Sequence, residues 1–201
     1  MNTYPAKNII NVAMAGHSGA GKTSLAEAML YLAGASDRRG KVGEGNTVCD
    51  SDPEEIRRKT SVSTAVAPFE WKNKKINLLD TPGLHKPRSR LGDYMCKVVT
   101  DTVSEVDVAV LVVEPIPNIG PAEESLIAQI KQHHMPAILV INKLDTVKKE
   151  ELLAVIATYA AVHEFDAVVP ISARTGEGVE ELLTEIDKYA IEGPQLFPED
   201  M

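Results

Sequence analysis

Eight consecutive residues at positions 16–23 read Gly-His-Ser-Gly-Ala-Gly-Lys-Thr and combine three glycines with a lysine and a hydroxyl group. They match the phosphate-loop pattern at every fixed position. The glycines can adopt backbone angles that turn successive N–H groups inward around an anion. The Lys22 ammonium could neutralise the outer phosphates, and the Thr23 hydroxyl could bind Mg²⁺. We therefore expect a nucleotide site, although this loop does not select the base.

The residues around this loop fit the same interpretation. An apolar run at 9–15 precedes it, and Ser24–Leu30 continues as a helical pattern whose positive end faces the loop. A chance glycine-rich turn is the alternative, and the strand before it and the helix after it count against that alternative. The predicted nucleotide contacts here are Gly16, His17, Ser18, Gly19, Ala20, Gly21, Lys22, Thr23 and Ser24.

Three further polar stretches follow apolar strands and specify the ligand more closely. Asp80-Thr81-Pro82-Gly83 offers a carboxylate that could hold Mg²⁺ through water and a glycine that allows close approach to a γ-phosphate. Asn142-Lys143-Leu144-Asp145 offers a carboxylate that could accept from N1 and the 2-amino group of guanine. Ser172-Ala173-Arg174 offers a backbone N–H for the guanine O6. The predicted contacts are Asp80, Gly83, Asn142, Lys143, Asp145, Ser172, Ala173 and Arg174.

Each of these stretches has an ordinary structural explanation when taken singly. An Asn-Lys-Xaa-Asp run is often a turn whose side chains cap a helix. All the motifs occur in order, however, and each comes at a predicted strand end. Ligands of parallel α/β sheets bind at those ends. The combination therefore favours a guanine nucleotide.

The apolar periodicity predicts the elements that position these motifs. Strands and helices alternate nearly throughout, so we expect a three-layer α/β P-loop fold with a mostly parallel six-stranded sheet and helices on both faces. Pro68 suggests an edge position for its strand. The expected strands are 9–15, 62–71, 76–79, 108–113, 137–141 and 167–171. The expected helices are 24–33, 91–105, 123–134, 148–162 and 179–190.

Composition sets broad limits on the class of protein. The 201 residues are 44% hydrophobic, which fits a globular chain, and the net charge of −8 disfavours non-specific binding to nucleic acid. Cys49 and Cys96 are far apart, so we expect free thiols. No apolar run approaches the length of a membrane span, and no signal peptide is visible. We expect a cytoplasmic protein and a monomer.

These motifs together resemble the GTPase superfamily, and the two halves resemble different members. Residues 16–83 resemble elongation factor G and its paralogues, through the phosphate loop and Asp52-Pro53-Glu54-Glu55-Ile56. Residues 84–201 resemble the Era family, through His85-Lys86-Pro87, Leu91–Met95 and the final stretch. A natural or constructed chimera with its seam at Asp80–Gly83 is the hypothesis that follows. The resemblance implies a GTP-binding domain at 1–191 and, at 192–201, a tail that in Era leads into an RNA-binding KH domain.

The resemblance also implies roles for individual residues. Mg²⁺ would be held by Thr23, Asp80 and a hydroxyl of the long polar segment 35–61, which would be switch one; Ser61 is the first choice and Thr60 the second. Lys22, Gly83 and His85 are the predicted catalytic residues. Elongation factors place a water-orienting His directly after the Asp-Xaa-Xaa-Gly motif, where this chain has Leu84, so we expect slow hydrolysis. His85 as an ordinary loop residue is the alternative.

Several functional alternatives stay open at this stage. The first is a guanine-nucleotide binding module with impaired hydrolysis, and the second is a P-loop ATPase or kinase. The family implies a ribosomal partner or ribosomal RNA, which the basic loop of Lys86, Arg88 and Arg90 could touch; a solvated loop is the other explanation. Era-type loops carry an Asn where this chain has Gly19, so potassium dependence is not implied.

Overall fold

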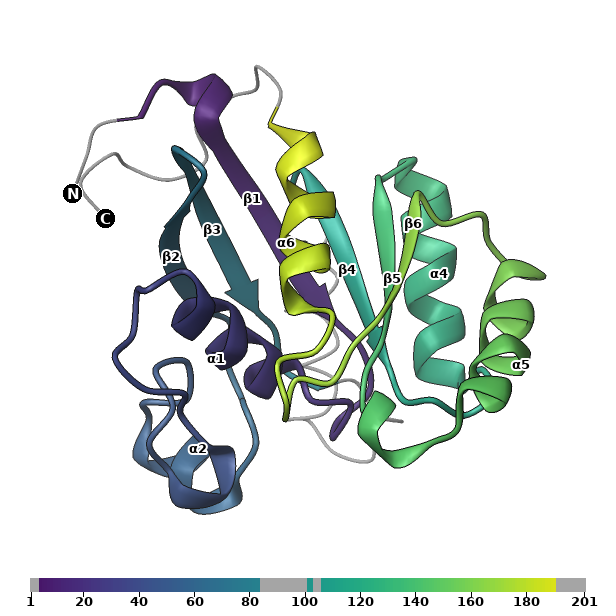
Figure 1. The fold of residues 1–201 in the computed structure, drawn as a ribbon, viewed down its shortest axis with the longest axis horizontal. Helices are drawn as coiled ribbons and strands as arrows, with labels where there is room; N and C mark the ends of the chain where they lie inside the picture. Colours follow the sequence, from purple (N-terminus) through teal and green to yellow (C-terminus); the bar gives the residue numbers. More distant parts are fainter. Residues whose placement is uncertain (1–3, 84–100, 103–105, 191–201) are drawn as a thin grey trace.

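The computed structural model describes residues 4–83, 101–102 and 106–190. Its centre is a six-stranded sheet in the order β2-β3-β1-β4-β5-β6 (Figure 1). Among the strand pairs of these residues, only β2 with β3 is antiparallel. The strands are β1 (Ile9–Ala15), β2 (Ala65–Trp71), β3 (Lys74–Asp80), β4 (Val108–Val113), β5 (Ala137–Ile141) and β6 (Ala167–Pro170). The expected three-layer α/β fold is confirmed.

Helices cover both faces of this sheet (Figure 1). Helices α1 and α6 pack on one face, and α4 and α5 on the other. The helices are α1 (Lys22–Leu32), α2 (Pro53–Arg58), α4 (Pro121–His133), α5 (Lys149–Ala160) and α6 (Val179–Ile186). Short 3-10 turns occupy Ala6–Asn8, Val42–Glu44, Leu144–Thr146 and Asp187–Tyr189. Among the described residues, no helix is long and apolar enough to cross a membrane.

The core is aliphatic because the central strands are buried on both faces. Every residue of β4 and β5 is buried, as continuous apolar runs in a parallel sheet require. Side chains that alternate along these strands join two separate clusters. One contains Leu25 of α1 and Leu182 of α6, and the other contains Leu126 of α4 and Val155 of α5.

The predicted elements differ from the observed ones mainly at their ends. The strand expected at 62–71 begins at Ala65 and lies at the sheet edge, where the missing N–H of Pro68 is tolerated. The helix expected at 179–190 ends at Ile186 and continues as a 3-10 turn. Most of the helix expected at 91–105 lies outside the described residues.

The polar segment 35–61, for which the sequence pattern predicts no helix, contains α2. The Asp52 carboxylate caps that helix by accepting the Glu54 N–H at 2.7 Å, and Pro53 occupies its first turn. Two buried carboxylates then fix the chain on either side. Glu27 of α1 accepts N–H groups of Gly40 and Val48, at 3.0 and 2.6 Å. Glu55 accepts the N–H groups of Val62 and Ser63.

Candidate functional site

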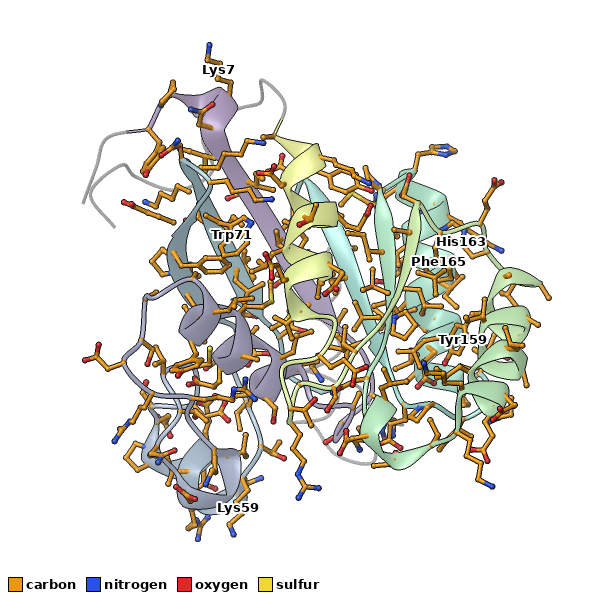
Figure 2. All side chains as sticks on the ribbon, in the orientation of Figure 1. Lys7, Lys59, Trp71, Tyr159, His163 and Phe165 are labelled. Carbon is orange, nitrogen blue, oxygen red and sulfur yellow. The ribbon has the colours of Figure 1, made fainter. Side chains whose placement is uncertain are left out.

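The predicted motifs meet at one edge of the sheet because β1, β3, β5 and β6 are parallel. Each motif begins at or just after the carboxyl end of its strand. Figure 2 shows Lys7, just before β1, and Lys59, at the end of α2, at opposite ends of the molecule. The parallel strands run from the Lys7 end towards the Lys59 end, so the site forms at the end of the molecule where segment 35–61 also lies.

The phosphate loop has the backbone shape that its glycines predict. Gly19 and Gly21 have φ angles of 87° and 93°, in the left-handed region that favours glycine. Gly16 lies so close to β4 that an added Cβ would be 2.1 Å from the Val112 carbonyl oxygen. Gly21 is the N-cap of α1 and provides no side-chain cap. The first N–H groups of the helix therefore have no acceptor from the cap residue and are directed at the loop. This arrangement can bind an anion.

Lys22 lies inside this loop with its ammonium directed at backbone carbonyls. Its Nζ atom donates to the oxygens of Gly16 and His17, both at 3.2 Å. Burial lowers the pKa of Lys22 to about 8, and the nearby carboxylates of Asp80 and Asp50 oppose that shift. A bound polyphosphate would add negative charge next to this ammonium and favour its charged form.

A hydroxyl-rich corner lies beside the loop at the start of α1. The hydroxyl oxygens of Thr23 and Ser61 are 3.1 Å apart, and Ser61 donates to a carboxylate oxygen of Asp50 at 2.7 Å. Of the two hydroxyls proposed for switch one, Ser61 is therefore the one beside Thr23. Thr60 lines the same cavity of about 190 Å³.

Asp80 gives this corner the chemistry of a cation site. Its side chain is buried, and neither carboxylate oxygen has a hydrogen-bond partner among the residues that the structure describes. Burial raises the pKa of Asp80 to about 7, although Thr23 and Lys22 oppose the shift. A buried carboxylate without a partner is unfavourable unless a cation compensates it. The predicted Mg²⁺ ligands Thr23, Ser61 and Asp80 therefore fit the ion.

Gly83 brings the Asp80–Gly83 stretch against the phosphate loop. A Cβ added at Gly83 would lie 2.4 Å from the Ser18 Cα atom, so only glycine allows this contact. Both residues line the cavity of about 190 Å³ together with Lys22. The expected close approach of Gly83 to a terminal phosphate is compatible with this position. His85, the third predicted catalytic residue, lies outside the described residues.

The buried Asn142 side chain forms hydrogen bonds with residues of three loops. Its Nδ2 atom donates to the Ala20 carbonyl at 2.8 Å, and its Oδ1 atom accepts the N–H groups of Lys143 and Ala173. The side chain thus connects the phosphate loop to both loops expected to contact the base. Gly21 gives it room, because a Cβ there would lie 2.3 Å from Nδ2.

Asp145 has an oriented carboxylate that lines a second cavity, of about 810 Å³. One oxygen accepts the Ser172 hydroxyl at 2.7 Å, and the other lies 3.7 Å from the exposed guanidinium of Arg174. The Ser172 hydrogen bond is the main reason why the pKa of Asp145 is lowered. Lys143 extends beside it and pairs with Glu114. The carboxylate is therefore ionised at neutral pH and can accept two N–H groups.

The second cavity continues from the first, with which it shares Gly19, Gly21, Ser24 and Val42. Its volume of about 810 Å³ lies in the range of small-ligand pockets. Its other lining residues are Arg39, Gly40, Lys41, Gly43, Asn142, Lys143, Asp145, Thr146, Ala173 and Arg174. A phosphate-sized cavity joined to a larger one has the form of a nucleotide site.

Three side chains that shape the site are not predicted from the sequence: Glu27, Arg39 and Asp50. All three depend on how segment 35–61 folds back over α1. A charged residue at a buried position of a helical pattern, as at Glu27, was the only available signal. Asp50 and Arg39 lie among other charged residues, and nothing in their spacing distinguishes them. Cys49 is a buried free thiol whose pKa is raised by burial, and Cys96 lies outside the described residues.

Comparison with known proteins supports this interpretation. The model of the elongation factor Tu GTP binding domain matches residues 7–192. GTPase Era of Ruminiclostridium cellulolyticum is 43% identical over 124 residues, which are 62% of this chain and 42% of that protein. GTPase Era of Clostridium acetobutylicum is 35% identical over 160 residues, 80% of this chain and 52% of that protein. The chain spans about half the length of these relatives.

Solved structures resemble this chain in fold. Era in complex with MgGDPNP and nucleotides 1506–1542 of 16S ribosomal RNA has a TM-score of 0.76 and 30% identity, over 96% of this chain and 61% of that one. A protein of Thermus thermophilus has a TM-score of 0.67 and 32% identity, over 77% of this chain and 22% of that one. The bacterial selenocysteine-specific elongation factor, at 24% identity and a TM-score of 0.71 over 93% of this chain and 29% of that one, shares the fold.

Proposed function

We propose that this chain, which belongs to the family of elongation factor Tu GTP binding domains, binds GTP and GDP with Mg²⁺ and hydrolyses GTP to GDP and phosphate. The observation that carries the proposal is the joined pair of cavities. Lys22, Thr23 and the unpartnered Asp80 line or flank the smaller cavity, and Asn142 and Asp145 line the larger. A single bound nucleotide would thus place its phosphates in the smaller cavity and its guanine in the larger, along one edge of the sheet.

The residues of the smaller cavity supply positioning and charge neutralisation, which phosphoryl transfer needs more than covalent chemistry. Backbone N–H groups of the phosphate loop would bind the β-phosphate, and the Lys22 ammonium would turn from the loop carbonyls to the β- and γ-oxygens. Thr23 and Ser61 would hold Mg²⁺ directly, and Asp80 would hold it through water. When bound, the ion supplies charge neutralisation between the β- and γ-phosphates. Gly83 would offer its N–H to the γ-phosphate.

The larger cavity supplies the choice of base. The Asp145 carboxylate would accept from N1 and the 2-amino group of guanine, which adenine cannot match. A backbone N–H of the loop after β6 would donate to O6. Adenine has no N–H at N1 and no 2-amino group, so it would leave the Asp145 carboxylate without these partners. Adenine nucleotides are therefore expected to bind much more weakly than guanine nucleotides.

Segment 35–61 would act as the nucleotide-dependent switch. Its Ser61 hydroxyl lies beside Thr23 in the hydroxyl-rich corner, and Asp50 accepts a hydrogen bond from that hydroxyl. Loss of the γ-phosphate would remove the charge that favours this arrangement and release the segment. We expect the intrinsic rate to be slow, because Leu84 takes the position at which elongation factors carry the water-orienting His.

Calorimetric titration of GDP, of a non-hydrolysable GTP analogue and of ATP tests the proposal in the presence of Mg²⁺. We expect the two guanine nucleotides to bind and ATP to bind far more weakly. Phosphate release from GTP is then followed on the same sample. Guanine binding without phosphate release would support the alternative, a binding module with impaired hydrolysis. Preference for ATP would contradict the assignment.

We further propose a ribosomal RNA partner, supported by the Era structure that is bound to 16S ribosomal RNA nucleotides 1506–1542. The net charge of −8 limits any contact to a local basic surface. Gel-shift titration with an RNA of that sequence, with and without the GTP analogue, tests it. Binding that vanishes when the RNA is replaced by an unrelated sequence supports a specific partner, and absence of binding contradicts it.

A further inference from the structure

Arg39 connects segment 35–61 to the loop that follows β6. Its Nη1 atom donates to the carbonyl oxygens of Ala173 and Arg174, at 3.1 and 2.7 Å. A guanidinium that donates to two successive carbonyls makes charge-assisted hydrogen bonds, which are stronger than neutral ones. The two partners lie 134 and 135 residues away in the chain, so this contact is a tertiary link across the mouth of the larger cavity.

The position of Arg39 is fixed from several sides. The next residue, Gly40, donates its N–H to the buried Glu27 carboxylate at 3.0 Å. The guanidinium carbon lies 5.8 Å from the centroid of the Tyr31 ring, within range of a cation–π contact. Opposite the guanidinium lies Gly176, where an added Cβ would come within 2.9 Å of Nη2. Arg39 is therefore held in place before any ligand enters.

The carbonyls that Arg39 holds determine where the loop directs its N–H groups. In a trans peptide the C=O of one residue and the N–H of the next point in opposite directions. The contact with the Ala173 carbonyl therefore orients the Arg174 N–H away from Arg39. The Ala173 N–H already donates to Asn142 at 3.0 Å, whereas the Arg174 N–H has no acceptor among the described residues.

We propose that Arg39 is a positioning residue for base recognition, which orients the Arg174 N–H towards the O6 atom of guanine. This inference rests on the proposed function, because it needs a guanine in the larger cavity. In this proposal Arg39 lines the larger cavity but does not itself bond to the base. It acts through the loop, and it makes the fit of guanine depend on the ordered start of segment 35–61. Base recognition and the switch are thereby linked by one side chain.

The test compares the affinity of two nucleotides that differ only in the atom at position 6, GDP and 6-thio-GDP. Sulfur is the weaker acceptor, so the wild-type chain should prefer GDP. In Arg39→Ala the oriented donor is lost, and we expect GDP affinity to fall by about tenfold while 6-thio-GDP affinity falls much less. The ratio of the two affinities should therefore approach one. Arg38→Ala, at the exposed neighbouring position, should leave both affinities unchanged.

Conservative variants of Arg39 distinguish a loss of orientation of the Arg174 N–H from a general loosening of the larger cavity. Arg39→Lys keeps the charge but not the planar fork and should give an intermediate ratio, and Arg39→Gln keeps an amide donor in case the alanine variant unfolds. An equal loss for both nucleotides, or no loss for either, would overturn the inference. Failure of the wild-type chain to bind GDP would overturn the proposed function instead.

Discussion

The Asn142 side chain donates to the carbonyl oxygen of Ala20 at 2.8 Å. This hydrogen bond joins the loop after β5, which is expected to contact the base, to the phosphate loop inside the protein. Asn142 is almost fully buried, so the contact is shielded from water. The loops that would bind the two ends of a nucleotide are thus aligned before the nucleotide arrives. Preorganisation of this kind lowers the entropy lost on binding.

Replacement of Asn142 by alanine should weaken both the fold and the site. The substitution leaves the Ala20 carbonyl and the Ala173 N–H without their partner, which should lower the free energy of unfolding by about 2 kcal/mol. GDP affinity should fall as well, because the two loops lose their common support. Urea denaturation and GDP titration measure the two effects. Asn118→Ala, an exposed position, is the matched control, and equal behaviour of the two variants would contradict the role of Asn142.

Replacement of Asp145 by asparagine should change the preferred base. The amide can no longer accept from both N1 and the 2-amino group of guanine, so we expect GDP affinity to fall by about 100-fold. Xanthine carries an oxygen at position 2 and can accept from the new amide, so xanthosine diphosphate should bind better than to the wild type. Competition titrations of the two nucleotides provide the measurement. A variant that loses both nucleotides equally would show that Asp145 acts through the fold alone.

Replacement of Asp80 by asparagine should stabilise the metal-free protein and remove its response to Mg²⁺. Burial raises the pKa of Asp80 to about 7, above the value of the unfolded chain, so the wild type loses stability as pH rises towards 7. The variant lacks this penalty, which is at most about 4 kcal/mol. Urea denaturation at pH 8 in a chelator, and again with Mg²⁺ and GDP, measures both effects. A variant less stable than the wild type without metal would contradict this interpretation.

Replacement of Glu27 by glutamine should loosen segment 35–61. The carboxylate accepts the N–H groups of Gly40, Val48 and Cys49, and a neutral amide oxygen would replace charge-assisted bonds by weaker ones. We expect a loss of about 2 kcal/mol and faster trypsin cleavage within the segment, which contains Arg38 and Lys41. Glu151→Gln on the exposed face of α5 is the control, and the same cleavage rate in both variants would count against the role of Glu27.

The sequence predicts the sheet, helices α1, α4, α5 and α6, and four motif positions because each depends on local patterns. The apolar run at 108–113 matches strand β4 to the residue, and Ser61, the first choice over Thr60 for the switch hydroxyl, lies beside Thr23. Contacts that depend on the folded course of segment 35–61 could not be predicted in this way. Asp50 beside Ser61, and Arg39 on the carbonyls of Ala173 and Arg174, arise from tertiary packing between distant residues.

The most direct test of the central claim is phosphate release from GTP in a single turnover with excess protein and Mg²⁺, with ATP measured in parallel. We expect slow release from GTP, essentially none from ATP, and loss of release when EDTA removes the metal. A Lys22→Ala variant should abolish release. Equal release from the two nucleotides, or release that survives both EDTA and the Lys22 substitution, would contradict the assignment of a guanine-specific, Mg²⁺-dependent GTPase site.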